Sequence, residues 1–103
     1  MYPRRLPQLL RATALAALLV LAACQTAPVQ EMSDARQAIS VAREAGAAVH
    51  AADDLNAAVE HLESAERFLS ERRYEFARRD AEQAKLRALD ALQRSESATG
   101  DKH

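Results

Sequence analysis

The sequence predicts an all-α fold, a short antiparallel helical hairpin or three-helix bundle, and three observations support this prediction. Apolar and Ala residues recur at alternating spacings of three and four from Met32 to Leu92, which places them on one face of each helix. The chain has only two Gly and three Pro among 103 residues and is rich in Ala, which argues against a β-sandwich. The length allows at most one small domain.

The first 23 residues have the pattern of a targeting segment. Residues 1–11 carry three arginines and no acid, and residues 12–23 are uncharged and almost wholly apolar. A positive start followed by a short apolar run that ends in small residues is typical of a secretory signal peptide. The apolar run is shorter than the roughly 20 residues that cross a bilayer as a helix. We therefore expect residues 1–23 to be a signal-peptide helix that precedes the helical bundle.

The end of this segment carries a modification motif. Leu21-Ala22-Ala23-Cys24 resembles the lipobox of bacterial lipoproteins at all four positions. The resemblance implies transfer of a diacylglyceryl group to the Cys24 sulfur and cleavage between Ala23 and Cys24. Because acyl chains of this length anchor firmly, we expect membrane lipid to hold the chain through Cys24. Gln25, not Asp, follows Cys24. By resemblance to Gram-negative lipoproteins, the absence of Asp at this position implies sorting to the inner leaflet of the bacterial outer membrane, with the domain facing the periplasm.

The remaining chain is predicted to be small and acidic. Cleavage after residue 23 removes three positive charges and changes the formal net charge from −1 to −4. Because nucleic-acid binding needs a basic surface, we expect no nucleic-acid partner. Residues 24–30 are expected to form a lipidated tether, residues 31–96 a helical domain, and residues 97–103 a disordered tail.

Three helices are expected, at about residues 31–49, 53–70 and 73–95. Asp53 or Asp54 is expected to cap the second helix, and Ser70–Arg73 is expected to form the turn before the third. The i,i+4 spacing predicts ion pairs within helices, such as Glu75–Arg79 and Asp90–Arg94. The inward face of the first helix is expected to carry Met32, Ala35, Ile39, Ala42, Gly46 and Val49. That of the second is expected to carry Leu55, Ala58, Val59, Leu62, Ala65 and Leu69. That of the third is expected to carry Tyr74, Ala77, Ala81, Ala84, Ala88, Ala91 and Leu92.

The Ala stripe of the third helix predicts close packing with a small core. Ala side chains let helix axes approach at the short end of the usual range of about 8–10 Å, but they bury little apolar area. A core of this kind in fewer than about 80 residues is marginal without additional support. The single Cys excludes an internal disulfide, so we expect a protein partner or self-association.

Two resemblances cover the predicted domain. The segment 53–92 resembles one helix–turn–helix unit of the tetratricopeptide type (TPR-like) at Ala65, Phe68, Tyr74, Ala77 and Ala84. Residues 35–39, 42–47, 54–58, 73–77 and 81–84 resemble, in order, segments of the bacterial lipoprotein family classed as domain of unknown function 4398. That family implies a helical, lipid-anchored and periplasm-facing protein, and its name carries no activity.

Candidate partner contacts surround the predicted second turn. Phe68 and Phe76 are either a packing seal of this turn or an exposed contact for a partner, and Leu86 is open to the same two interpretations. Four arginines near this turn are also open to two interpretations: Arg72, Arg73, Arg78 and Arg79. They are either a contact for an anionic polymer or a lipid headgroup, or a solvated face that neighbouring acids neutralise.

No residue pattern predicts catalysis or a cofactor. The single thiol is assigned to lipid, and the serines and histidines show no nucleophile arrangement. His50, His61, Asp53 and Asp54 lack the spacing that places metal ligands on one helical face, so we expect no metal site. The only group attached to the chain is expected to be the lipid on Cys24.

These features predict a lipid-anchored envelope protein with a structural or scaffold role. Its expected partner is an envelope protein or a second copy of the chain, with peptidoglycan in its vicinity. The alternative is an oligomeric coiled coil that resembles the major murein lipoprotein and links the membrane to peptidoglycan. That family joins a C-terminal Lys to peptidoglycan, whereas Lys102 here precedes His103, and Gly46 interrupts the heptads.

Overall fold

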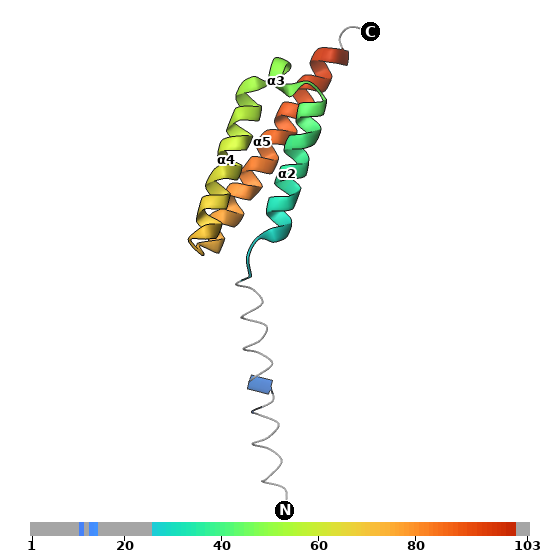
Figure 1. Ribbon diagram of the computed structural model, residues 1–103. Helices are drawn as coiled ribbons and strands as arrows, with labels where there is room; N and C mark the ends of the chain where they lie inside the picture. Colours follow the sequence, from blue (N-terminus) through green and yellow to red (C-terminus); the bar gives the residue numbers. More distant parts are fainter. Residues whose placement is uncertain (1–10, 12, 15–25, 101–103) are drawn as a thin grey trace, which may run out of the picture.

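The computed structural model describes residues 11, 13–14 and 26–100. Residues 26–100 form four helices, α2 (Val29–Glu44), α3 (Ala47–His50), α4 (Ala52–Ser70) and α5 (Tyr74–Gly100), as Figure 1 shows. No strand occurs among the described residues. The predicted all-α class and bundle architecture are confirmed.

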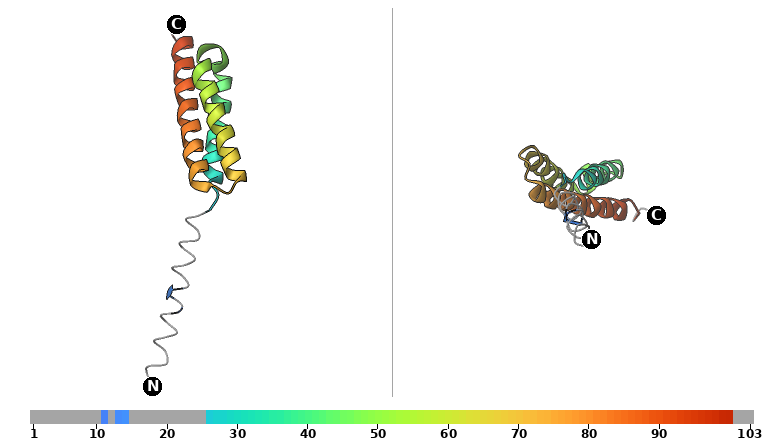
Figure 2. Two further views of the ribbon diagram at one scale, coloured as in Figure 1. Left: turned by 90° about the vertical axis from the view of Figure 1, so that its left-hand side faces the viewer. Right: turned by 90° about the horizontal axis from the view of Figure 1, so that it is seen from below.

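The three long helices run up, down and up along the bundle. A short turn joins α4 to α5, so these two helices pack as an antiparallel pair (Figure 1). Helix α2 lies along the same side of α5, and the end-on view in Figure 2 shows α2 and α4 diverging above α5. Helix α5 is therefore the element that both other long helices pack against. The start of α2 and the α4–α5 turn lie at the same end of the bundle (Figures 1 and 2).

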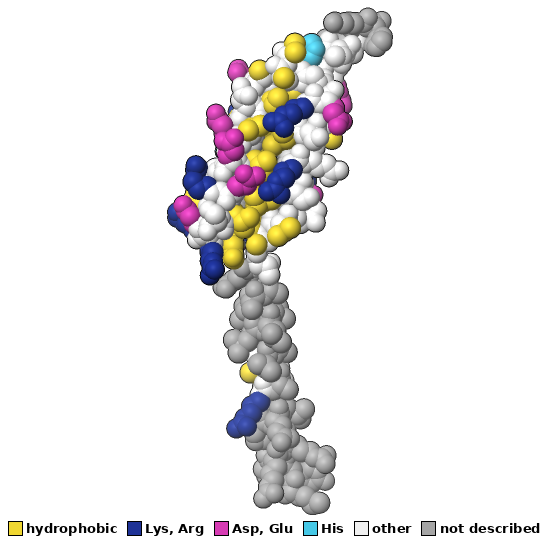
Figure 3. Space-filling view, in the orientation of Figure 1, with side chains coloured by type: hydrophobic (Ala, Val, Ile, Leu, Met, Phe, Trp, Pro, Cys, Tyr) yellow, Lys and Arg dark blue, Asp and Glu magenta, His cyan; other side chains and the backbone are white. Residues whose placement is uncertain are grey.

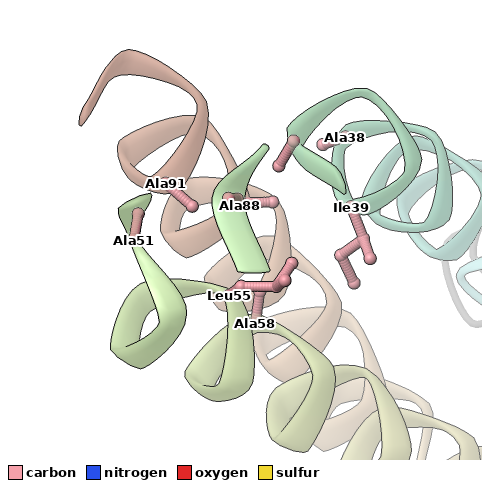
Figure 4. Close-up of a cluster of buried hydrophobic side chains, with 9 residues drawn as sticks. Ala38, Ile39, Ala51, Leu55, Ala58, Ala88 and Ala91 are labelled. Atoms are coloured by element: carbon pink, nitrogen blue, oxygen red, sulfur yellow. The ribbon is translucent and has the colours of Figure 1, made fainter. Parts of the chain in front are cut away.

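The core consists largely of alanine. Every predicted Ala position of the α5 stripe is buried, and α2 and α4 contribute further alanines with Met32, Ile39 and Leu55. Figure 4 shows Ala38 and Ile39 of α2 and Leu55 and Ala58 of α4 gathered around Ala88 of α5. The largest side chains below 2% exposure are Met32, Pro28 and Ser95. Because an Ala methyl stabilises by less than about 1 kcal/mol, the core holds the helices close together but supplies little energy per contact.

The predicted first helix, 31–49, is wrong at its C-terminal end. Helix α2 ends at Glu44, Gly46 has a φ of 89°, and the short helix α3 follows from Ala47. A positive φ carries no steric penalty at Gly, which is why helices commonly end beside it. The chain changes direction here, and Val49, an expected core position, is 81% exposed.

The predicted third helix and tail also need correction. Helix α5 continues to Gly100, although the sequence predicted a helix end near residue 95 and a disordered tail from residue 97. The hydroxyl of Ser95 donates to the Ala91 carbonyl (2.8 Å), and the hydroxyl of Thr99 donates to the Ser95 carbonyl (3.1 Å). These bonds satisfy the hydroxyls within the helix, so buried Ser95 extends the Ala stripe by one more turn.

Candidate interaction surface at the basic end of the bundle

The turn between α4 and α5 is a Schellman motif with an arginine in the usual glycine position. The Arg73 N–H donates to the Phe68 carbonyl (2.8 Å) and the Arg72 N–H donates to the Leu69 carbonyl (3.0 Å). Arg72 has a φ of 61°, the left-handed conformation that this motif requires. Sequence reasoning placed the turn correctly without a Gly or Pro signal, but it had no means to detect the left-handed arginine.

Two phenylalanines and two arginines stack across this turn. The Phe68 and Phe76 ring centroids are 5.3 Å apart, and the Arg73 guanidinium lies 5.2 Å from the first ring and 4.5 Å from the second. The Arg79 guanidinium lies 6.0 Å from the Phe76 ring. The aromatic pair therefore packs against itself, as the packing-seal interpretation expects. Phe76 is nevertheless 45% exposed, so a partner contact stays a prediction.

Arg78 ties the start of the described bundle to α5. Its Nε lies 3.2 Å from the Glu31 carboxylate, its Nη1 donates to Glu75 (2.6 Å), and its Nη2 donates to the Thr26 carbonyl (3.2 Å). Pro28 is buried, and α2 begins at the next residue. In the described part of the predicted tether, Thr26 bonds to Arg78, Pro28 is buried, and Val29 and Gln30 already belong to α2. The sequence prediction was wrong here because Pro, which disfavours a helix interior, suits the position just before a helix.

The end of the bundle formed by residues 26–31 and 67–79, here called the basic end, carries an excess of arginine. It holds Arg67, Arg72, Arg73, Arg78 and Arg79 against Glu31, Glu71 and Glu75. Among the described residues, Arg67, Arg72 and Arg79 form no ion pair, and Arg73 lies 3.9 Å from Glu71. Figure 3 shows Lys and Arg side chains gathered at the lower left, where α4 ends and turns into α5. The predicted Glu75–Arg79 pair does not form, because Glu75 contacts Arg78 instead.

Leu86 does not belong to this end. It is 53% exposed on α5 and has no place in either cluster of buried side chains. An open groove of about 300 Å³ lies between α2 and α5, and Leu86 is not among the residues that line it. The residues that line it are Asp34, Gln37, Ala38, Val41, Lys85, Leu89 and Leu92.

A buried carboxylate joins α4 to α5, and sequence reasoning missed it. Asp54 was expected as a candidate helix cap, but Ala51 occupies the N-cap position of α4 without a side-chain bond. The Asp54 side chain is 6% exposed and lies 3.5 Å from Arg87 and 3.0 Å from Arg94. Arg94 pairs with this tertiary partner, and no Asp90–Arg94 pair forms. Only the packing of the two helices brings these charges together.

His61, Asp80 and Ser64 form a second polar contact between the same helices. The Ser64 hydroxyl donates to Asp80 Oδ2 (2.5 Å), and His61 Nδ1 lies 3.2 Å from Asp80 Oδ1. A nucleophilic triad needs the serine hydroxyl on the histidine, with the carboxylate behind it. Here the serine and histidine both bond to the carboxylate, so the trio orders the α4–α5 contact and does not activate the hydroxyl.

The other sequence predictions concern metal, membrane and the lipid site. In the part of the chain that the structure describes, no three His, Cys, Asp or Glu side chains converge as metal ligands would. None of the helices within that part combines the length and hydropathy of a membrane span. The predicted cleavage and lipidation residues, Ala23 and Cys24, lie outside the described residues.

The geometry defines a class of protein: a small helical bundle with a core of alanines. Ion pairs between its helices and a cluster of arginines at one end complete the description. The chain belongs to the family described as Domain of unknown function (DUF4398), whose model matches residues 30–102. This match confirms the family that the sequence resembles. The comparisons with curated proteins and with solved structures found no match.

Proposed function

We propose that the protein is a lipid-anchored lipoprotein of the bacterial outer membrane, facing the periplasm, with a scaffold or adaptor role in the envelope. The observation that carries the proposal is the motif Leu21-Ala22-Ala23-Cys24, which stands directly before the folded domain. A lipid on Cys24 supplies membrane attachment, and the helices supply a surface for a partner. The family has no assigned activity, so the proposal depends on this motif and on the geometry of the bundle.

The thin core supports an interaction role. The α5 stripe is Ala from Ala77 to Ala91, and larger side chains along its edges stay partly exposed, including Leu89 at 42%. Figure 3 shows a stripe of hydrophobic side chains along one face of the bundle, and the groove between α2 and α5 adds an open concave surface. A bundle with little buried area per contact gains stability when a partner covers such surfaces. The partner that covers these surfaces would be an envelope protein or a second copy of the chain.

The bundle geometry also favours a non-enzymatic role. The groove between α2 and α5 is open to solvent, whereas substrate sites enclose most of their ligand. The Ser–His–Asp cluster among residues 26–100 is arranged for structure, because Ser64 donates to Asp80. We therefore assign the protein no catalysis and no cofactor other than the lipid.

The murein-lipoprotein-like alternative receives less support from the fold. That arrangement needs long helices that associate between chains. Here α2, α4 and α5 pack on one another within one chain, and Gly46 ends α2 after 16 residues. Release of the protein by detergent without lysozyme would favour lipid tethering alone, whereas release that requires lysozyme would favour attachment to peptidoglycan.

The lipid assignment is tested with one substitution and one matched control. Cys24→Ser should abolish incorporation of labelled palmitate and leave the precursor uncleaved, because the hydroxyl does not replace the thioether-forming thiol. Gln25→Asp, at the next position, should retain the label and move the protein to the inner-membrane fraction. Palmitate labelling of the Cys24→Ser chain would refute the lipoprotein assignment. Cross-linking in cells followed by mass spectrometry would then name the partner.

A further inference from the structure

We infer that the basic end of the bundle rests on the phospholipid surface to which the chain is anchored, with its arginines against lipid phosphates. The bundle would then stand on the membrane with its α3 end directed away from it. This inference rests on the proposed lipid anchor at Cys24 and adds an orientation and a second contact. Four observations carry it.

The first observation is the distance along the chain between the anchor and the bundle. Cys24 precedes Thr26 by two residues, which span at most about 7 Å when fully extended. The Thr26 carbonyl accepts from Arg78 (3.2 Å), and Pro28 is buried. The lipid-bearing residue is therefore only two positions from the first residue that bonds to the bundle. The start of α2 must lie within about one helix diameter of the membrane surface.

The second observation is which part of the bundle shares that position. The α4–α5 turn lies at the same end as the start of α2, whereas α3 lies at the opposite end (Figures 1 and 2). Arg78, near the start of α5, bonds to the Thr26 carbonyl and to Glu31, and so it fixes the start of α2 beside the beginning of α5 that follows the turn. An anchor at Cys24 consequently brings the turn with Arg72 and Arg73 to the lipid.

The third observation is the charge polarity of the domain. The basic end carries five arginines against three glutamates. The rest of the described bundle, residues 32–66 and 80–100, carries five Lys or Arg against eleven Asp or Glu. An anionic lipid surface attracts the first region and repels the second, so the electrostatic field favours one orientation. The net acidic charge of the whole chain conceals this division.

The fourth observation is the chemistry of the exposed groups. Arg73 and Arg79 lie against the Phe76 ring, which orders their guanidinium groups beside a half-exposed aromatic side chain. Guanidinium is weakly hydrated and presents paired donors that match phosphate oxygens. Arg72, held in the left-handed conformation at the tip of the turn, projects from the same end without an ion-pair partner among the described residues. This combination of arginine and aromatic groups suits a headgroup layer.

The orientation can be measured on the full mature lipoprotein reconstituted in vesicles. Because Cys24 carries the only thiol and the lipid occupies it, a second cysteine can be labelled selectively. Ser70→Cys places a fluorophore beside the turn, and Val49→Cys places one at the opposite end, where the native side chain is 81% exposed. Vesicles of phosphatidylethanolamine and phosphatidylglycerol, with a quencher on the headgroup, should quench the probe at position 70 and leave the probe at position 49 bright.

A matched pair of charge variants tests the cause of the orientation. Arg72→Gln with Arg79→Gln should lower the ratio of membrane-resting to detached bundles by about 25-fold, at about fivefold for each charge. Arg43→Gln with Lys85→Gln removes the same charge from outside the basic end and should not lower this ratio. The effect of the first pair should vanish on vesicles of phosphatidylcholine alone. Circular dichroism of each variant confirms that the helices are intact.

The outcomes separate this inference from the proposed function. Flotation of the protein with vesicles, together with quenching at position 70 alone, supports both. Flotation with equal quenching at both positions, or with no response to the Arg72 and Arg79 changes on the anionic vesicles, overturns the orientation and leaves the lipid anchor standing. Failure of the mature chain to float overturns the anchor and the orientation together.

Discussion

Asp54 is a buried carboxylate whose two partners are exposed, and this asymmetry gives a sharp prediction. Its side chain is 6% exposed, whereas the side chains of Arg87 and Arg94 are 45% and 70% exposed. Oδ2 accepts no hydrogen bond of good geometry from the described residues, although Arg94 Nη1 lies 3.0 Å away. The positive charges of the two arginines therefore compensate the carboxylate. Removing the acid and removing the arginines should have unequal effects.

The unequal magnitudes follow from what each change leaves behind. Asp54→Ala leaves two exposed arginines that water can hydrate, so the free energy of unfolding should fall by about 1 kcal/mol. Arg87→Gln with Arg94→Gln leaves a buried carboxylate without a compensating charge, and breaking a buried pair in this way costs about 3 kcal/mol. For a domain of this size, 1 kcal/mol lowers Tm by about 4–8 °C, so the double arginine variant should melt about 12–24 °C lower.

Thermal melts of segment 25–103 followed by far-UV circular dichroism measure this difference. The triple variant, with Asp54→Ala added to both arginine changes, should recover about 2 kcal/mol relative to the arginine variant, because the uncompensated charge is gone. If Arg87→Gln with Arg94→Gln lowers Tm no more than Asp54→Ala does, the carboxylate is not buried at the α4–α5 contact and the reasoning fails.

Three further substitutions, two of them with a matched control, test the backbone and the Ala stripe by the same melts. Arg72→Gly should raise the free energy of unfolding by about 1 kcal/mol, because Gly adopts the φ of 61° without a steric penalty. The control Arg79→Gly, within α5, should lower it by about 1 kcal/mol. A loss of stability in both variants would contradict the left-handed turn. Gly46→Ala should destabilise the bundle by about 1 kcal/mol, because φ at this position is 89° and the new Cβ would lie 3.3 Å from the His50 ring. An unchanged Tm would argue against the break after α2. Ala84→Leu should lower the free energy of unfolding by about 1–3 kcal/mol, because it overpacks a position with 0% exposure. The control Leu86→Ala, on the exposed face of α5, should change it by no more than about 0.5 kcal/mol. Equal effects of the two changes would mean that the Ala stripe is not a helix contact.

The α5 stripe was the most accurate sequence prediction. Ala77, Ala81, Ala84, Ala88 and Ala91 are all fully buried, as the alternation of three and four predicted. Helical periodicity is a local property, so a run of small residues on one face identifies that face before any partner helix is known. The same reasoning failed at Val49, because it extended one period across Gly46, where the left-handed backbone changes the direction of the chain.

The candidate partner residues divided in a way that the sequence did not predict. Phe68 and Phe76 come together with Arg73 at the turn, whereas Leu86 lies elsewhere on α5. The spacing around the turn indicated that the aromatic residues were near one another, but it did not reveal that Arg73 stacks on both. Nor did it reveal that Arg78 joins this end to Thr26, because those residues are 52 positions apart in the chain.

The sequence by itself determined the helical class, the inward face of each long helix, the turn after Ser70 and the family to which the chain belongs. Each of these depends on local periodicity or on an ordered set of residues. The tertiary structure alone decided that Asp54 faces Arg87 and Arg94, that Glu31 pairs with Arg78, and that the start of α2 lies at the same end as the arginines of the α4–α5 turn. Charged side chains are compatible with many positions on a helix surface, and only the packing of α2 and α4 on α5 selects their partners.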